Sequence, residues 1–159
     1  MLRHFEVRGG SGGRVDDISY TGMFSIQDTA DVTVEYAALS EASSDFDDMM
    51  HIIYSEGIVL RKLTLIGAPF DGLDIDFSQV RIDDAVFDKS GNDGLDFMDS
   101  RAVVKNSRMT SSGDKGASVG EGSNVLLINN WIAGNTIGIE SKDGSVAMVL
   151  GGELDGNLK

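Results

Sequence analysis

The sequence predicts an all-β solenoid, a right-handed parallel β-helix of about six or seven coils with about 22 residues in each coil. Glycines recur every 22 residues at Gly72, Gly94, Gly116 and Gly138, and the segments around them align without gaps. Each repeat carries three short apolar segments with a period of two, which is the period of a β-strand. Stacked coils would pair the backbone of each repeat with its neighbours and enclose a continuous core. The repeated glycine is expected at a turn with positive φ or at a tight contact.

The apolar positions assign an inward face to each strand. The first segment of the repeats is expected to point these side chains into the core: Leu73, Ile75, Leu95, Phe97, Ala117, Val119 and Ile139. The second segment recurs from residues 58–60 to residues 80–82, and the third places Trp131 in the core beside Phe87 and Met109. A β-sandwich is the rival fold, but it gives no reason for identity at 22 residues.

The upstream part of the chain follows the same pattern with a longer spacing. Residues 24–34 match residues 50–60 at an offset of 26, which predicts an insertion within residues 37–48. A short helix beginning at Ala37 is an alternative for the start of this segment. Turn chemistry is expected from Asp99, Glu121 and Asp143 with the serines beside them, and from Asn106, Asn129 and Asn130, because such side chains bond turn amides.

Composition bounds the classes of protein. The chain has 159 residues, no cysteine and a formal net charge of −13, which favours one domain over residues 1–159 without disulfides or thiolate metal sites. The acidic balance argues against nucleic acid and anionic membranes as partners, because both need clustered lysine and arginine. No stretch approaches the ~20 apolar residues of a membrane span. A piece of a longer protein would have the same composition.

The acidic repeats resemble a known superfamily. The segments that carry the resemblance are Asp71-Gly-Leu-Asp-Ile-Asp, Gly91-Asn-Asp-Gly-Leu-Asp and Gly113-Asp-Lys-Gly-Ala-Ser-Val-Gly-Glu. They are similar to parallel β-helix proteins of the pectate-lyase-like superfamily and, more narrowly, to repeat domains of bacterial surface and spore-coat-associated proteins, some of which accompany CotH-type kinases. The resemblance implies a right-handed β-helix and an extracellular or cell-envelope role. Polygalacturonase motifs are absent from the matching coils. Pectate lyases use an arginine base, and no arginine is expected on the outward face of these coils.

The solenoid brings residues 22 apart in the sequence to about 4.8 Å from one another, so columns of outward residues matter most. Stacked carboxylates repel, and this repulsion is relieved by raised pKa values, by solvent or by a cation. Oxygen ligands are those that Ca²⁺ prefers. The predicted Ca²⁺ ligands are Asp71, Asp74, Asp76, Asp93 and Asp96. The alternative is that these acids form a hydrated face that keeps the solenoid soluble.

Three further side chains are candidates for catalysis. Lys115 continues the column of Asp71 and Asp93, and Lys142 shares a face with Glu140. Either lysine would serve as a base or stabilise charge beside a cation-bound uronate, or else form an ion pair with its acidic neighbours. His51 lies one coil before Asp74, and a histidine beside an aspartate suits acid–base chemistry.

Two functions remain open from the sequence. The first is a non-catalytic β-helix module with an acidic, Ca²⁺-binding face in a bacterial surface or envelope protein. The second is a calcium-dependent polysaccharide lyase or epimerase that acts on an acidic polysaccharide. Expected partners are a polysaccharide or a flanking domain. Terminal coils without caps also predict end-to-end association, because they expose core side chains and unpaired backbone groups.

Overall fold

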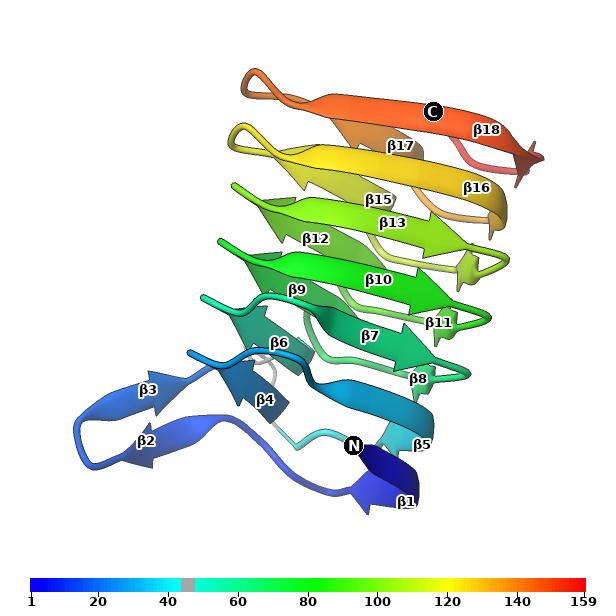
Figure 1. Cartoon of the computed structure of the whole chain (residues 1–159). Coiled ribbons are helices and arrows are strands. Elements are labelled where there is room, and N and C mark those ends of the chain that lie inside the picture. The colour runs from blue at the N-terminus through cyan, green and yellow to red at the C-terminus, as the bar shows by residue number, and fades with distance from the viewer. Residues whose placement is uncertain (44–47) are drawn as a thin grey trace.

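The computed structural model describes residues 1–43 and 48–159, which form a parallel β-solenoid (Figure 1). No helix occurs among these residues. The strands are β1 (Leu2–Arg8), β2 (Gly13–Val15), β3 (Ile18–Tyr20), β4 (Gly22–Gln27), β5 (Thr33–Ser40), β6 (Asp48–Ile53), β7 (Ile58–Arg61), β8 (Thr64–Ile66), β9 (Leu73–Asp76), β10 (Gln79–Asp83), β11 (Val86–Asp88), β12 (Leu95–Met98), β13 (Arg101–Lys105), β14 (Arg108–Thr110), β15 (Lys115–Gly120), β16 (Asn124–Ala133), β17 (Ile137–Ser141) and β18 (Val146–Asp155).

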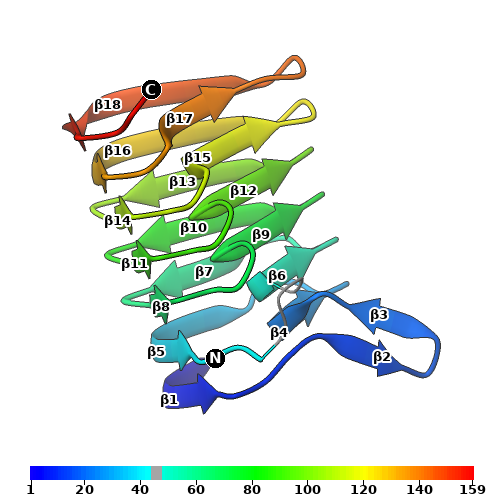
Figure 2. The same cartoon turned by 180° about the vertical axis from the view of Figure 1, so that it is seen from behind.

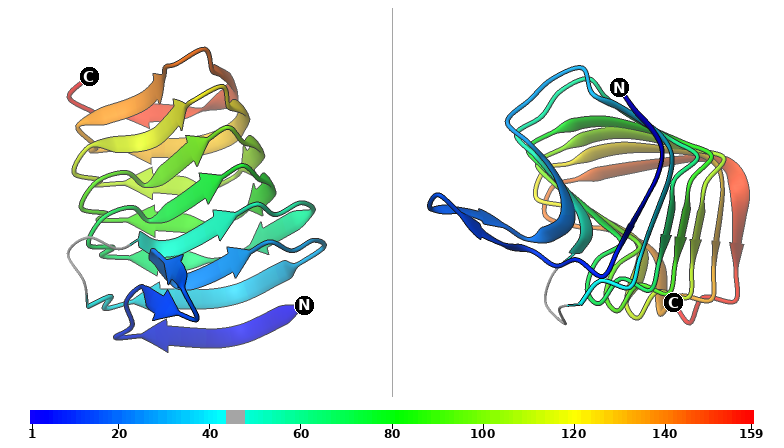
Figure 3. Two further views of the ribbon diagram at one scale, coloured as in Figure 1. Left: turned by 90° about the vertical axis from the view of Figure 1, so that its left-hand side faces the viewer. Right: turned by 90° about the horizontal axis from the view of Figure 1, so that it is seen from below.

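The coils stack from the N-terminus to the C-terminus, and each contributes one strand to each side of the solenoid (Figures 1 and 2). One side is a six-stranded sheet in the order β17-β15-β12-β9-β6-β4. The other two sides belong to a ten-stranded sheet, because the long strands β5 and β16 continue around the corner between them. Seen along the axis, the coils superpose around one enclosed core (Figure 3).

The strand register confirms the sequence repeat. Val80 pairs with Ala102 and Leu95 with Ala117, both at an offset of 22, while Phe24 pairs with Met50 at the expected offset of 26. The extra residues of that longer coil fall largely between β5 and β6, inside the predicted insertion at residues 37–48, of which residues 44–47 lie outside the described part. Residues 37–40 belong to β5, where they pair with β1 and β8. The alternative of a short helix beginning at residue 37 is therefore wrong.

Each coil turns its corners with residues in the left-handed backbone conformation. The first corner holds Asp99, Glu121 and Asp143, with φ of 43°, 51° and 51°. The serines that follow form a ladder in which the Ser78 amide donates to Ser100 Oγ at 2.9 Å and the Ser100 amide donates to Ser123 Oγ at 3.0 Å. The expected turn chemistry is thus confirmed at this corner.

The asparagines serve two other corners. Asn106 and Asn129 take the left-handed position of the second corner, with φ of 51° and 52°. Asn130 continues a ladder from Ser107, whose amide donates to Asn130 Oδ1 at 2.8 Å. Buried amides at the corners are therefore paired by side chains of the next coil, as the sequence predicts.

The repeated glycine marks a tight contact and not a positive φ. A Cβ atom on Gly72 would lie 2.5 Å from the carbonyl oxygen of Gly94, and one on Gly94 would lie 2.8 Å from that of Gly116. Neither residue has positive φ. The coils approach so closely at this position that any side chain would collide with the backbone above it.

The core fills the inside of the coils. Of the predicted inward residues, six are fully buried and Ile139 is partly buried against them. Trp131 departs from the prediction: it pairs with Arg108, it is only half-buried, and the Arg108 guanidinium lies 4.0 Å from its ring centroid. Ile132 takes the core position beside Met109. The coil between them has 23 residues, because the turn at residues 121–123 is one residue longer, and this shifts Trp131 outward.

The two ends of the solenoid differ. At the N-terminal end, β2 and β3 form an antiparallel hairpin that projects from the stack (Figures 1 and 3). Its turn residues Asp16 and Asp17 both have positive φ, which is typical of a two-residue type I′ turn. At the C-terminal end, the core positions of the last coil are open, with Val149 44% and Leu154 55% exposed.

Candidate functional site

The outer face of the six-stranded sheet carries the predicted site residues. One row crosses five of its strands in strict register: His51 (β6), Asp74 (β9), Asp96 (β12), Ser118 (β15) and Glu140 (β17). Their sequence neighbours point into the core, so these side chains point outward. We call this surface, together with the flanking acids of the same strands, the acidic face.

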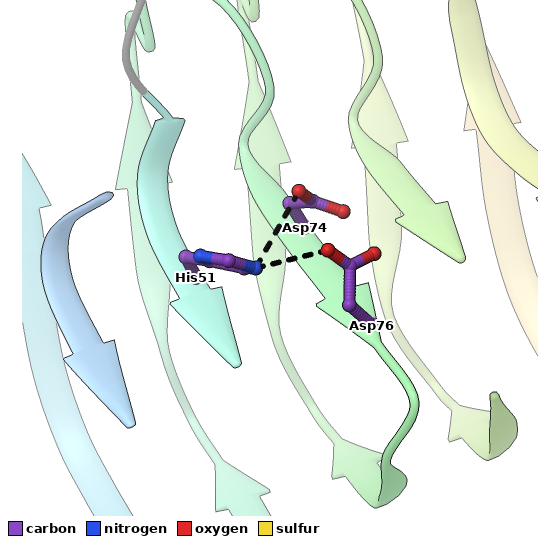
Figure 4. A group of neighbouring side chains, drawn as sticks. All are labelled: His51, Asp74 and Asp76. Carbon is purple, nitrogen blue, oxygen red and sulfur yellow. Dashed lines mark hydrogen bonds and ion pairs between the residues drawn. The ribbon is translucent and has the colours of Figure 1, made fainter. Parts of the chain in front are cut away.

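His51, Asp74 and Asp76 form a compact cluster on this face (Figure 4). His51 Nε2 lies 3.2 Å from Asp76 Oδ2 and 3.7 Å from Asp74 Oδ2, and all three side chains are largely buried. The other ring nitrogen, Nδ1, lies 2.8 Å from Thr21 Oγ1. Thr21 immediately follows the β2–β3 hairpin, so the N-terminal coil fixes the orientation of the ring.

The carboxyl group of Asp74 is strongly perturbed. Burial raises its pKa first, and the charges of Asp76, Asp48, Asp96 and Asp71 raise it further, to about 9. Among the described residues, no lysine or arginine forms an ion pair with Asp74 or Asp76. The cluster therefore holds a proton at neutral pH or attracts a cation in its place.

Asp71 and Asp93 lie at the edge of the acidic face but have a structural use. Asp71 Oδ1 accepts the amide hydrogen of Asp93 at 2.7 Å, and Asp93 Oδ1 accepts that of Lys115 at 2.8 Å. Burial raises the pKa of Asp71 to about 7 and that of Asp93 to about 6, although these amide bonds and the Lys115 charge oppose the increase. One oxygen of each predicted Ca²⁺ ligand is thus occupied by the backbone of the next coil.

The two candidate lysines lie beyond Asp96, away from His51. Lys115 is buried, with Nζ 2.6 Å from Asp114, 3.6 Å from Asp93 and 3.7 Å from Glu140. Burial lowers the pKa of Lys115, but the hydrogen bond to Asp114 and the surrounding carboxylates outweigh this effect and raise it overall. Lys142 is half-exposed, with Nζ 3.9 Å from Glu140.

The structure therefore separates the predicted residues into two groups. His51, Asp74 and Asp76 meet, with Asp96 beside Asp74, while Lys115 and Lys142 gather around Glu140. Sequence reasoning missed Thr21, although an Asp-Asp pair between Val15 and Ile18 is a signal for the hairpin that positions it. It also missed Ser118, whose buried hydroxyl has no hydrogen-bond partner.

Arginines on the second sheet correct another expectation. Arg61 and Arg81 point outward from β7 and β10, where both lie near Asp83, at 3.8 Å and 2.7 Å. The expectation that no arginine lies on an outward face is therefore wrong for this sheet. These guanidinium groups are engaged in a charge ladder with Glu35 and Asp83. The strands that carry the acidic face, β6, β9, β12, β15 and β17, contain no arginine.

Comparison with known proteins agrees with this architecture. The chain resembles the crystal structure of the enzymatically active domain of bacteriophage CBA120 tailspike protein 2, with a TM-score of 0.62 and 12% sequence identity. The match covers 96% of this chain and 28% of that one, so the chain spans little more than a quarter of its length. No curated protein matches the sequence. No helix long and apolar enough to cross a membrane occurs in the described residues. The family described as the right handed beta helix region matches residues 48–153, and the chain belongs to this family.

Proposed function

We propose that the acidic face binds a divalent cation at Asp74 and Asp76 and uses it to hold an acidic polysaccharide. The chain then acts as a non-catalytic β-helix module of a bacterial surface or envelope protein. The observation that carries this proposal is the meeting of two largely buried carboxylates that no lysine or arginine of the described chain neutralises. A bound cation would offset the charges that raise the pKa of Asp74.

Ca²⁺ is the ion that the carboxylates suggest, since it takes six to eight oxygen ligands. Asp96 is the register neighbour of Asp74 and offers a further carboxylate. Asp71 and Asp93 contribute negative charge, but each has one oxygen committed to an amide. The protein ligands alone do not fill such a coordination shell. Water and the carboxylates of a uronic-acid polymer would complete it, and this explains how a cation links an acidic protein to an acidic glycan.

Thermal unfolding tests cation binding. An ion that binds only the folded state raises stability by RT ln(1 + [L]/Kd). We expect a saturable rise of the unfolding midpoint with Ca²⁺ relative to EDTA, which Mg²⁺ does not reproduce. The Asp74→Asn/Asp96→Asn variant should lose the rise. Asp143→Asn is the matched control, because Asp143 is exposed on a turn whose positive φ asparagine also tolerates.

Polysaccharide binding is tested separately. Retention on immobilised polygalacturonate should require the cation and should disappear in EDTA and in the double variant, while Asp143→Asn is retained. A wild-type chain that shows no midpoint change with any divalent cation would refute the cation site, and retention that persists in EDTA would refute the bridging role.

A polysaccharide lyase or epimerase is the second candidate, and the raised pKa of Asp74 favours it. A carboxyl group that stays protonated at neutral pH is suited to donate a proton to an oxygen of the sugar. Lys115 is unsuited as the base, because its surrounding carboxylates keep it charged. Lys142 and His51 remain as bases. Formation of unsaturated chain ends or epimerised units from polyuronates, abolished in Asp74→Asn and intact in Asp143→Asn, would establish this activity.

A further inference from the structure

We infer that the ion of the acidic face is a transition-metal cation such as Zn²⁺, bound by His51 Nε2 and by one carboxylate oxygen each of Asp74 and Asp76. An oxygen of the bound sugar would take the fourth position. This inference rests on the proposed cation binding and names the class of ion. It differs from Ca²⁺ binding because an imidazole nitrogen is a ligand for zinc and related metals, whereas Ca²⁺ takes oxygen ligands.

The spacing of the three ligand atoms fits a small four-coordinate ion. Bonds of about 2.0–2.1 Å in a tetrahedron place ligand atoms about 3.3–3.4 Å apart. His51 Nε2 lies 3.2 Å and 3.7 Å from the two carboxylate oxygens, and all three atoms lie within 4.8 Å of one another. An ion can therefore enter the cluster with small rotations of the aspartate side chains.

The histidine is held in the orientation that a ligand needs. Metal-binding histidines usually bond a second protein group through the ring nitrogen that does not contact the metal. Here His51 Nδ1 lies 2.8 Å from Thr21 Oγ1, and a proton on Nδ1 is donated to that hydroxyl. Nε2 then presents its lone pair toward Asp74 and Asp76 (Figure 4). The ring is buried, so its orientation is fixed before any ion arrives.

The surroundings supply charge and an open side. Asp48, Asp71 and Asp96 all act on the Asp74 carboxyl with negative charge. The nearest lysine of the face, Lys115, is engaged with three other carboxylates. The side chain of Asp74 keeps 21% of its surface exposed, and that of Asp76 keeps 12%. Three protein ligands with one accessible position are typical of zinc sites that bind an exogenous oxygen.

A protonated His51 paired with the two aspartates is the competing arrangement, and titration calorimetry distinguishes the two. We expect the full chain to bind one Zn²⁺, with Co²⁺ as a substitute that gives the visible absorption of a tetrahedral site. His51→Gln should weaken Zn²⁺ binding by more than the ~10–100-fold typical of losing a second-shell contact. Thr21→Val should weaken it by about 10–100-fold while retaining the ligands. Asp143→Asn should bind as the wild type does.

The outcomes separate this inference from the broader proposal. Ca²⁺ binding that is lost in Asp74→Asn/Asp96→Asn but unchanged in His51→Gln would retain the cation-binding function and overturn the transition-metal site. Binding of no ion at all would overturn both. Thermal unfolding in EDTA verifies that His51→Gln is folded, and Thr21→Val provides an independent test if it is not. Zn²⁺ affinity that is equal in wild type and Thr21→Val would refute the positioning of the ring.

Discussion

The glycine column gives a direct test of how closely the coils stack. In Gly72→Ala the new methyl group would lie 2.5 Å from the carbonyl oxygen of Gly94 and 2.8 Å from Ser90 Oγ. Ordinary contacts begin at 3.4 Å, so this carbonyl would have to retreat by about 0.9 Å. The same carbonyl accepts the Leu73 amide hydrogen at 3.2 Å, and the shift would weaken that bond.

The expected cost follows from these contacts. Overpacking costs about 1–3 kcal/mol, and a weakened hydrogen bond costs up to about 1 kcal/mol more. Gly72 has no positive φ, so alanine restricts the unfolded chain and recovers about 0.4–1 kcal/mol. The net loss of unfolding free energy is about 1–3 kcal/mol. At about 2–4 °C per kcal/mol for a chain of this size, the midpoint should fall by about 3–10 °C.

Gly13→Ala is the matched control, because a Cβ there meets nothing within 4 Å and its φ is not positive. It should leave the midpoint unchanged or raise it slightly. Thermal and urea unfolding followed by circular dichroism, in EDTA, measures both variants. Equal midpoints for Gly72→Ala and Gly13→Ala would refute the assignment of the 22-residue glycine to a tight contact between coils.

Three further predictions test the corners, the buried acids and the open end. Ser100→Ala leaves the buried Ser78 amide without its acceptor and should lower the free energy of unfolding by about 1–3 kcal/mol, measured by urea titration; no loss would contradict the serine ladder. Asp71 has a folded pKa of about 7, above its ordinary value of 3.8, so its neutral form contributes stability that is full below the unfolded pKa and is lost as pH rises through about 7. Asp71→Asn should remove this fall, which unfolding between pH 4 and 8 measures, and an unchanged pH profile would contradict the burial of the acid. Leu154→Lys should abolish any concentration-dependent association seen by light scattering, because Leu154 is 55% exposed at an open core position, whereas a wild type that remains monomeric at high concentration would refute end-to-end stacking.

The fold could be predicted because a solenoid converts sequence period into contact. Residues 22 apart pair directly, as Val80 does with Ala102, so the spacing of the repeat is the register of the sheet. Local deviations were harder to predict. The extra residue in the turn before Ser123 moves every later strand position by one, and a shift of one residue exchanges the two faces of a strand. Trp131 therefore lies outside and Ile132 inside.

The candidate site was predicted less fully, because equal residue types have different roles. Asp71 and Asp74 are both acids of one repeat, yet Asp71 Oδ1 accepts an amide hydrogen of the next coil while Asp74 faces His51. This difference depends on which amide lies above each carboxylate, and the sequence of a single repeat does not contain that information. The Thr21 contact with His51 depends likewise on how a hairpin of the first coil meets the second.

The cluster arises where the repeat is broken, and this gives a further test of the site. In the row that contains Asp76, the next coil carries Met98, so methionine is already accommodated at the equivalent position. Asp76→Met removes a carboxylate that is 9% exposed and has no lysine or arginine partner in the described chain. Replacing such a buried charged group by an apolar residue is often neutral or stabilising. The unfolding midpoint in EDTA should therefore stay the same or rise.

The response to cations should change in the opposite direction. Without Asp76 the cluster retains His51 and Asp74 only, and the saturable midpoint rise with Zn²⁺ or Ca²⁺ should disappear although the protein is at least as stable. A merely structural role for Asp76 predicts a destabilised variant, because the interaction with His51 at 3.2 Å would be lost. A stable variant that still shows the full cation response would refute the site, since Asp76 could then not be a ligand.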